Sequence, residues 1–112
     1  MQVLENMFIV NRRFFNYAIA MKEFVTKVGS PVGLHARPAA LFAQAAKASG
    51  CKVALAKIAE DGSESALVDG ASILKIMSLG IKCGESIKVQ VEGDSEDSAV
   101  TNLQAIVEST EH

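Results

Sequence analysis

The segment from residue 85 to residue 92 constrains the fold more than any other part of the chain. Apolar and polar side chains alternate strictly within it, and the apolar ones are Ile87, Val89 and Val91. A strand with this pattern buries one face and leaves the other in water, which is typical of an antiparallel sheet with one solvent-exposed side. We therefore expect helices to cover only one face of the sheet that contains this strand.

The rest of the chain alternates short segments of strand-like and helix-like pattern. Strands are predicted over residues 23–28, 51–58, 64–68 and 85–92, and a hairpin turn at residues 60–63 joins the middle two. Helices are predicted over residues 36–49 and 72–79, and a third is expected to be capped by Asp94. The order β-α-β-β-α-β-α predicts an α+β fold, an open-faced two-layer sandwich with three helices on one face of a four-stranded antiparallel sheet.

Residues 1–20 differ in composition from the remainder of the chain. They hold three of the five Phe residues, the only Tyr and two of the three Arg residues. No uninterrupted apolar stretch follows Arg12 and Arg13, so the pattern does not indicate a secretory signal. We expect an upstream start or a disordered extension here, with an amphipathic segment that docks on the domain or on another copy as the alternative. Residues 21–112 are expected to form the single folded domain.

Composition excludes several classes of function. The 112 residues correspond to one domain, and the net charge of −2 provides no basic surface for nucleic acid or an anionic membrane. No apolar run approaches the roughly 20 residues of a transmembrane helix. Cys51 and Cys83 lie 32 positions apart without a metal-site or redox spacing, so we expect small buried apolar side chains in a reducing cytoplasm. The sequence thus favours a cytoplasmic monomer without metal or cofactor.

The stretch Gly-Leu-His-Ala-Arg-Pro-Ala at residues 33–39 is the one with the most specific chemistry. The predicted turn ends at His35, which places this histidine at the helix N-cap, with Pro38 in the first turn where a missing N–H costs little. The backbone N–H groups of Ala36 and Arg37 would then point outward at the positive end of the helix dipole, which suits an anion. The Arg37 guanidinium adds planar donors that fit phosphate oxygens.

This arrangement predicts a phosphoryl group carried on the His35 ring. Neutral imidazole is a nucleophile, and phosphoryl transfer depends mostly on positioning and charge stabilisation. The Nδ1 nitrogen is expected to react, because a capping histidine directs that nitrogen toward the helix amides. A histidine before a helix is more often a simple cap or surface residue, and the surrounding motif is what favours the chemical interpretation.

The motif at 33–39, together with Ser-Ile-Leu-Lys-Ile-Met-Ser-Leu-Gly at 72–80, resembles the HPr phosphocarrier family of the bacterial sugar phosphotransferase system. The likeness runs from about residue 22 to residue 110, so residues 21–112 are expected to be an HPr-like domain. It implies that His35 accepts phosphate from phosphoenolpyruvate by way of enzyme I and passes it to IIA components of sugar permeases. It also implies that Arg37 steadies the phosphoryl group. Such a protein is a stoichiometric carrier, not an enzyme.

By the same resemblance, Ser72 matches the serine that an HPr kinase/phosphorylase modifies in many relatives, and a transcriptional regulator is a further implied partner. Ser72 is also a predicted N-cap, where the helix dipole would stabilise a phosphate, and capping alone is the alternative. Ile73, Leu74 and Met77 are expected to form a partner patch, although such a stripe is core by default. The alternative function is a regulatory interaction protein, an HPr paralogue of a nitrogen- or carbon-control branch.

The sequence departs from the family pattern in three places. Val32 replaces a small polar residue, the hairpin around Asp61 and Gly62 is longer than usual, and Lys75 stands where relatives often have Gly. A cation at Lys75 would assist a phosphate on Ser72 or change the choice of partner. A small phosphatase or acyl transferase is disfavoured, because the chain offers no second acid or base and no P-loop.

Overall fold

The computed structural model describes residues 21–110, so the predictions about residues 1–20 lie outside it. The elements follow the predicted order along the chain, which confirms the β-α-β-β-α-β-α arrangement. They are β1 (Met21–Lys27), α1 (Ala36–Ser49), β2 (Lys52–Ile58), β3 (Val68–Asp69), α2 (Ile73–Ser78), β4 (Ser86–Glu92) and α3 (Glu96–Glu108).

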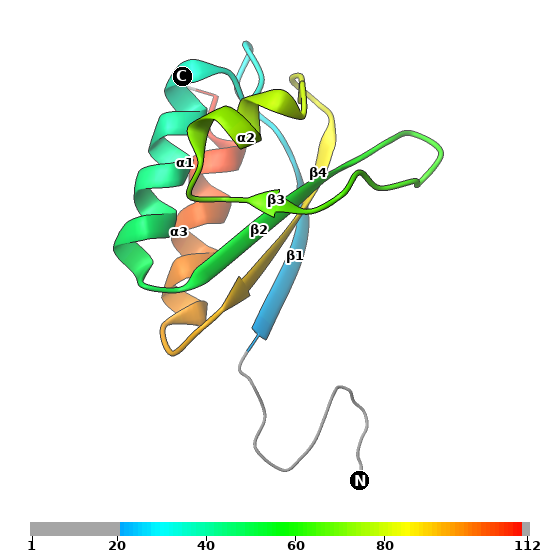
Figure 1. Ribbon diagram of the computed structural model, residues 1–112. Coiled ribbons are helices and arrows are strands. Elements are labelled where there is room, and N and C mark those ends of the chain that lie inside the picture. Colours follow the sequence, from blue (N-terminus) through cyan, green and yellow to red (C-terminus); the bar gives the residue numbers. More distant parts are fainter. Residues whose placement is uncertain (1–20, 111–112) are drawn as a thin grey trace, which may run out of the picture.

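The four strands form one sheet in the order β1-β4-β2-β3, and every neighbouring pair is antiparallel. Val89 of β4 lies between Phe24 of β1 and Leu55 of β2, so the apolar side chains of three strands share one face. The three helices lie on that face and leave the other face open (Figure 1). The structure thus confirms the open-faced α+β sandwich.

The core fills the space between the sheet and the helices. Small side chains on α1 permit close packing against α3, and Phe42 projects from the same helix into the core with no exposed surface. Full burial of a side chain of this size contributes about 1.5–3 kcal/mol. The largest wholly buried apolar side chains are Phe42, Leu55, Ile76, Ile87, Leu103, Val89, Val91 and Val107. No helix within residues 21–110 is long and apolar enough to cross a membrane.

The return strand predicted over residues 64–68 is wrong, because β3 comprises only two residues. Glu64 forms an isolated bridge with Ile58, and the ladder then stops. The Ser65 hydroxyl accepts the N–H of Lys57 at 2.9 Å, and the Ser65 N–H donates to the Lys57 carbonyl at 2.9 Å. A side-chain oxygen therefore occupies the position of a main-chain carbonyl, and this interrupts the regular strand.

Two local predictions also differ from the structure. The N-cap of α3 is Ser95 and not Asp94, because the first helical hydrogen bond runs from the Ala99 N–H to the Ser95 carbonyl. Both cysteines are free, as expected, but Cys83 is exposed and Cys51 only partly buried. Cys83 lies in the tight turn that leads into β4, which directs its side chain away from the core.

Candidate functional site

Helix α1 begins where the sequence predicts, with His35 at its N-cap. The backbone of His35 is extended (φ −91°, ψ −161°), and its carbonyl accepts the first helical hydrogen bond from Ala39 at 2.9 Å. Pro38 lies in the first turn and is buried. Because proline has no backbone N–H, the helix has one fewer amide without a partner at this end. The helix ends at Gly50, whose left-handed backbone (φ 70°) lets its N–H bond to the Lys47 carbonyl.

The groups expected to handle phosphate are all open to solvent. The side chains of His35 and Arg37 are exposed, and the His35 ring makes no capping hydrogen bond. Within residues 21–110, neither the Ala36 N–H nor the Arg37 N–H has a hydrogen-bond acceptor, and the Arg37 guanidinium forms no ion pair. The imidazole, the two backbone amides and the guanidinium therefore all belong to the N-cap and the first turn of α1. A helix N-terminus of this kind stabilises an anion.

The expectation that Nδ1 reacts rested on a hydrogen bond from the ring to the helix amides. That bond is absent in the structure. Both amides consequently have no acceptor within residues 21–110. The assignment to Nδ1 stays a prediction without the geometric support first given for it.

The loop before α1 is fixed by backbone hydrogen bonds to distant segments. The Val28 N–H donates to the Glu85 carbonyl at 3.0 Å, and the Gly29 N–H donates to the Val107 carbonyl at 2.9 Å. The Leu34 N–H donates to the Ile81 carbonyl at 3.0 Å, and the Leu34 side chain is buried. His35 is thus an exposed residue that directly follows a firmly anchored one.

Gly33 is required by this anchoring. Its backbone is left-handed (φ 72°), and a Cβ atom built on it would overlap the Ile81 carbonyl oxygen and the Lys82 Cα atom.

Val32 is 59% exposed, and the Ser30 hydroxyl accepts its N–H at 3.4 Å. Ser30 therefore supplies a side-chain oxygen to this loop.

Sequence reasoning missed the segment of residues 81–85. This segment lies against the loop before α1 and donates or accepts three of its backbone hydrogen bonds. The local signals were Gly84 and Gly33, whose residue type indicates tight backbone turns in the two segments. The bonds join main-chain atoms about 50 residues apart, so no side-chain pattern indicates them.

Two carboxylates near this end of the molecule have lowered pKa values. The Lys82 N–H, and then Lys57, lower the pKa of Glu85 below its ordinary value. The Thr26 hydroxyl, and then the Gln104 amide, lower the pKa of Glu108. Within residues 21–110 no cluster of three or more His, Cys, Asp or Glu side chains could hold a metal ion.

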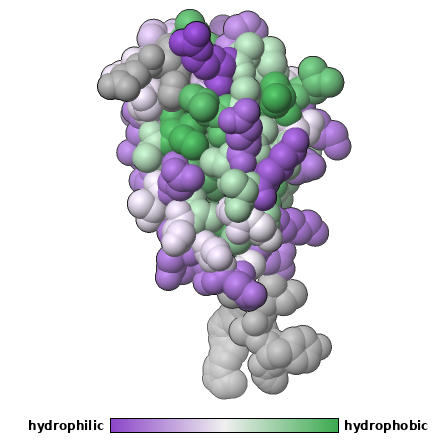
Figure 2. All heavy atoms as spheres, turned by 90° about the vertical axis from the view of Figure 1, so that its left-hand side faces the viewer, coloured by the Kyte–Doolittle hydropathy of each residue, from purple (hydrophilic) through white to green (hydrophobic). Residues whose placement is uncertain are grey.

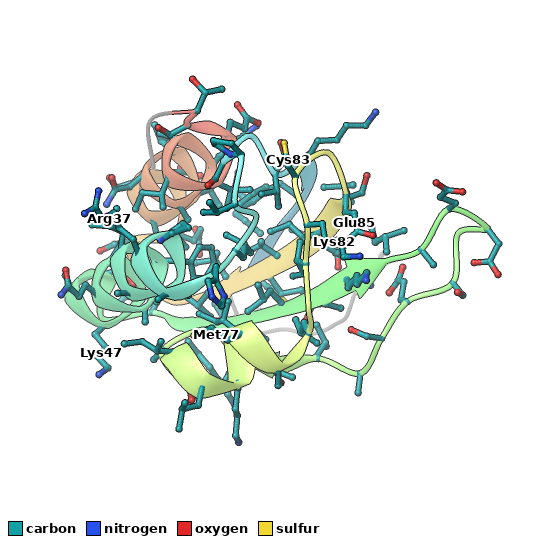
Figure 3. The ribbon with its side chains drawn as sticks, turned by 90° about the horizontal axis from the view of Figure 1, so that it is seen from above. Arg37, Lys47, Met77, Lys82, Cys83 and Glu85 are labelled. Atoms are coloured by element: carbon teal, nitrogen blue, oxygen red, sulfur yellow. The ribbon has the colours of Figure 1, made fainter. Side chains whose placement is uncertain are left out.

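Ser72 is the N-cap of α2 as predicted, and its hydroxyl accepts the Lys75 N–H at 3.3 Å. The N-terminus of α1, helix α2 and the C-terminus of α3 lie at the same end of the sandwich (Figure 1). Figure 3 looks down on this end and labels Arg37 on α1 and Met77 on α2. The structure therefore brings the two predicted motifs to one end of the molecule.

The predicted partner patch is only partly exposed. Leu74 is 80% exposed and Ile73 is 40% exposed, whereas Met77 is half-buried. Ile76 lies wholly in the core, which is why α2 stays packed on the domain. Apolar side chains also reach the surface on the helical face, among more polar ones (Figure 2). Whether partners bind the patch stays a prediction.

Comparisons with known proteins agree with this fold. The HPr phosphocarrier protein of Streptomyces coelicolor is 39% identical over 87 residues, which is 78% of this chain and 88% of that protein. The HPr-like protein Crh of Halalkalibacterium halodurans is 38% identical over 88 residues, 79% of this chain and 98% of that one. The crystal structure of HPr from Bacillus anthracis matches with a TM-score of 0.68 and 38% identity, and the match covers 79% of this chain and 98% of that chain.

The fold and the similar proteins define a phosphocarrier domain. A family model described as the PTS HPr component phosphorylation site matches residues 22–109. The chain therefore belongs to the HPr family of the phosphotransferase system. Members of this family are components of that system and not catalysts in their own right.

Proposed function

We propose that this protein accepts a phosphoryl group on His35 from phosphorylated enzyme I and passes it to IIA components of sugar permeases. The observation that supports the proposal is the open N-terminus of α1. There the exposed His35 is followed directly by Ala36 and Arg37, whose amides have no acceptor within residues 21–110, and Arg37 itself is exposed.

The proposed transfer uses these groups in a simple way. The lone pair of a neutral ring nitrogen attacks phosphorus, and the bond between phosphorus and the donor breaks as the new nitrogen–phosphorus bond forms. The other ring nitrogen keeps its proton, so the ring loses none. The Ala36 and Arg37 amides and the Arg37 guanidinium stabilise the negative charge of the phosphoryl oxygens.

A carrier must also protect its phosphoryl group from water. Within residues 21–110 no carboxylate is hydrogen-bonded to the His35 ring. The exposure of His35 lets a partner approach and leave, which suits brief encounters with several proteins.

Phosphorylation in a purified system tests this proposal. The protein is mixed with enzyme I and phosphoenolpyruvate, and we expect one acid-labile, base-stable phosphate on His35. The chain has two histidines, so His35→Ala removes the candidate acceptor and His112→Ala is the matched control. Label on His35→Ala, or its absence from the wild type, would contradict the proposal. Transfer of the label to a IIA domain tests the second step.

We also propose that Ser72 is a regulatory phosphorylation site for an HPr kinase/phosphorylase. The observation that favours it is the position of Ser72 immediately before the two most exposed residues of the patch, Ile73 and Leu74. A phosphate there would change the charge of a surface suited to protein contacts. If a transcriptional regulator binds that surface, the protein would act as a regulatory interaction protein, which is the alternative to a phosphocarrier for sugar transport.

The test is ATP-dependent labelling by such a kinase, followed by capture of partners before and after labelling. Ser72→Ala is expected to abolish the label, whereas Ser78→Ala keeps it. Ser78 is the other serine of this short helical segment, and its hydroxyl donates to the Lys75 carbonyl. Label on Ser72→Ala would show that another residue is modified.

A further inference from the structure

The structure assigns to Glu85 a positioning role for His35, exerted through the turn of residues 82–85. This inference rests on the proposed phosphoryl transfer and extends it to a residue outside both motifs. Glu85 does not contact the ring. It fixes the segment to which the loop before α1 is hydrogen-bonded.

Glu85 closes its turn in two ways. Its backbone N–H donates to the Lys82 carbonyl at 3.1 Å, and its carboxylate accepts the Lys82 N–H at 2.7 Å. Gly84 allows this tight path because its backbone is left-handed (φ 84°). Lys82, Cys83 and Glu85 follow one another along this loop at the end of the molecule seen in Figure 3. The carboxylate thus ties the start of the turn to its end.

A second element holds the same carboxylate. The Lys57 ammonium on β2 lies 3.4 Å from Glu85 Oε1, and both side chains of the pair are about one-third exposed. Exposed ion pairs of this kind contribute little, whereas a charged acceptor strengthens a hydrogen bond to a backbone amide. The pKa of the Glu85 carboxyl is lowered mainly by the Lys82 N–H and less by Lys57. The hydrogen bond to Lys82 is therefore the more important contact.

The turn is joined to both ends of the loop that carries His35. At the beginning of the loop, Gly84 donates to the Val28 carbonyl at 2.8 Å and Val28 donates to the Glu85 carbonyl at 3.0 Å. At its end, Leu34 donates to the Ile81 carbonyl at 3.0 Å. A displaced turn would consequently move Leu34 and the neighbouring His35 relative to the amides of α1. Misplacement of a reacting group by about 1 Å is enough to slow a reaction by up to about 100-fold.

The test compares three variants at a temperature well below the melting temperature of each. Glu85→Ala removes the acceptor for the Lys82 N–H. Glu85→Gln keeps an oxygen in the same place and loses only the charge. Glu64→Ala is the matched control, because it breaks the 2.5 Å contact between Glu64 and Lys88, an ion pair without hydrogen bonds to the His35 loop.

Two measurements separate positioning from stability. With this protein as the phosphoryl acceptor of enzyme I and phosphoenolpyruvate, we expect Glu85→Ala to lower the kcat of enzyme I by about tenfold. The KM of enzyme I for this protein should stay unchanged. Glu85→Gln should recover most of the loss, and Glu64→Ala should match the wild type. In the unphosphorylated protein, the amide chemical shifts of Leu34 and Ala36 should change in Glu85→Ala and stay at wild-type values in the control.

The inference is wrong if Glu85→Ala keeps both its kcat and the amide shifts of the loop. It is equally wrong if kcat falls in Glu64→Ala as much as in Glu85→Ala, because the effect would then follow general stability. A wild-type protein that takes no phosphate on His35 would overturn the proposed function. The amide shifts would still decide whether Glu85 positions the loop.

Discussion

Helices α1 and α2 lie at the same end of the sandwich, and they differ in whether a side chain accepts a hydrogen bond from a first-turn amide. Helix α2 uses the hydroxyl of Ser72 to accept the Lys75 N–H. Helix α1 has His35 at the equivalent position, and that ring accepts no amide. One helix satisfies its N-terminus from within the chain, and the other leaves donors for an external anion.

The difference has a cost in stability. A side chain that caps a helix contributes typically about 1 kcal/mol, which α1 forgoes by having an uncapped histidine. Burial of Phe42, Ala39 and Ala43 along α1 keeps the helix in place without a cap. Natural proteins often break a local rule at a functional site and compensate elsewhere, and the open end of α1 fits that pattern.

Replacing His35 with Ser would give α1 the type of cap that α2 has, and it is the change with the largest expected effect. We expect complete loss of acid-labile phosphate, because the nucleophilic ring is gone. We also expect a gain of about 1 kcal/mol in the free energy of unfolding, since serine is a strong N-cap. Phosphorylation assays and urea unfolding measure the two effects. A variant that loses phosphorylation without any gain in stability would show that the amides of α1 are already satisfied in solution.

Arg37→Ala removes the side-chain cation at the open end of α1 and keeps its backbone amide. We expect the rate of phosphorylation to fall by roughly 100-fold, the loss typical when one donor to a developing charge is removed. Lys47→Ala is the control, because it removes a cation from the last turn of the same helix. The measurement is the initial rate with enzyme I and phosphoenolpyruvate. An equal loss in both variants would mean that overall charge matters more than position.

Much of this comparison was predictable from the sequence. The alternating pattern in β4, the glycine that ends α1 and the caps of α1 and α2 depend on side chains within a few residues of one another. The motif at residues 33–39 predicted the N-cap position of His35 correctly, whereas the expected contact of its ring with the helix amides is absent. Local patterns of this kind are the ones that a single sequence records well.

The errors share a different physical cause. The strand expected over residues 64–68 fails because the hydroxyl of Ser65 competes for the Lys57 N–H, a choice made between two segments. The role of residues 81–85 depends on backbone bonds to Val28 and Leu34, which any side chain could accompany. Where main-chain atoms meet across the fold, side-chain patterns carry little information.

Ser72→Ala is the opposite change, and it removes the cap that α2 has. We expect a loss of about 0.5–1 kcal/mol in the free energy of unfolding, at the low end for an N-cap because the 3.3 Å hydrogen bond is long. For a domain of this size each kcal/mol shifts the melting temperature by about 4–8 °C, so calorimetry can resolve the change. Phosphorylation of His35 should be unaffected, because within residues 21–110 no hydrogen bond joins Ser72 to the loop before α1. A slower transfer to His35 in this variant would show that the two helix ends are coupled, and the contrast between an open and a closed N-terminus would then describe one linked unit.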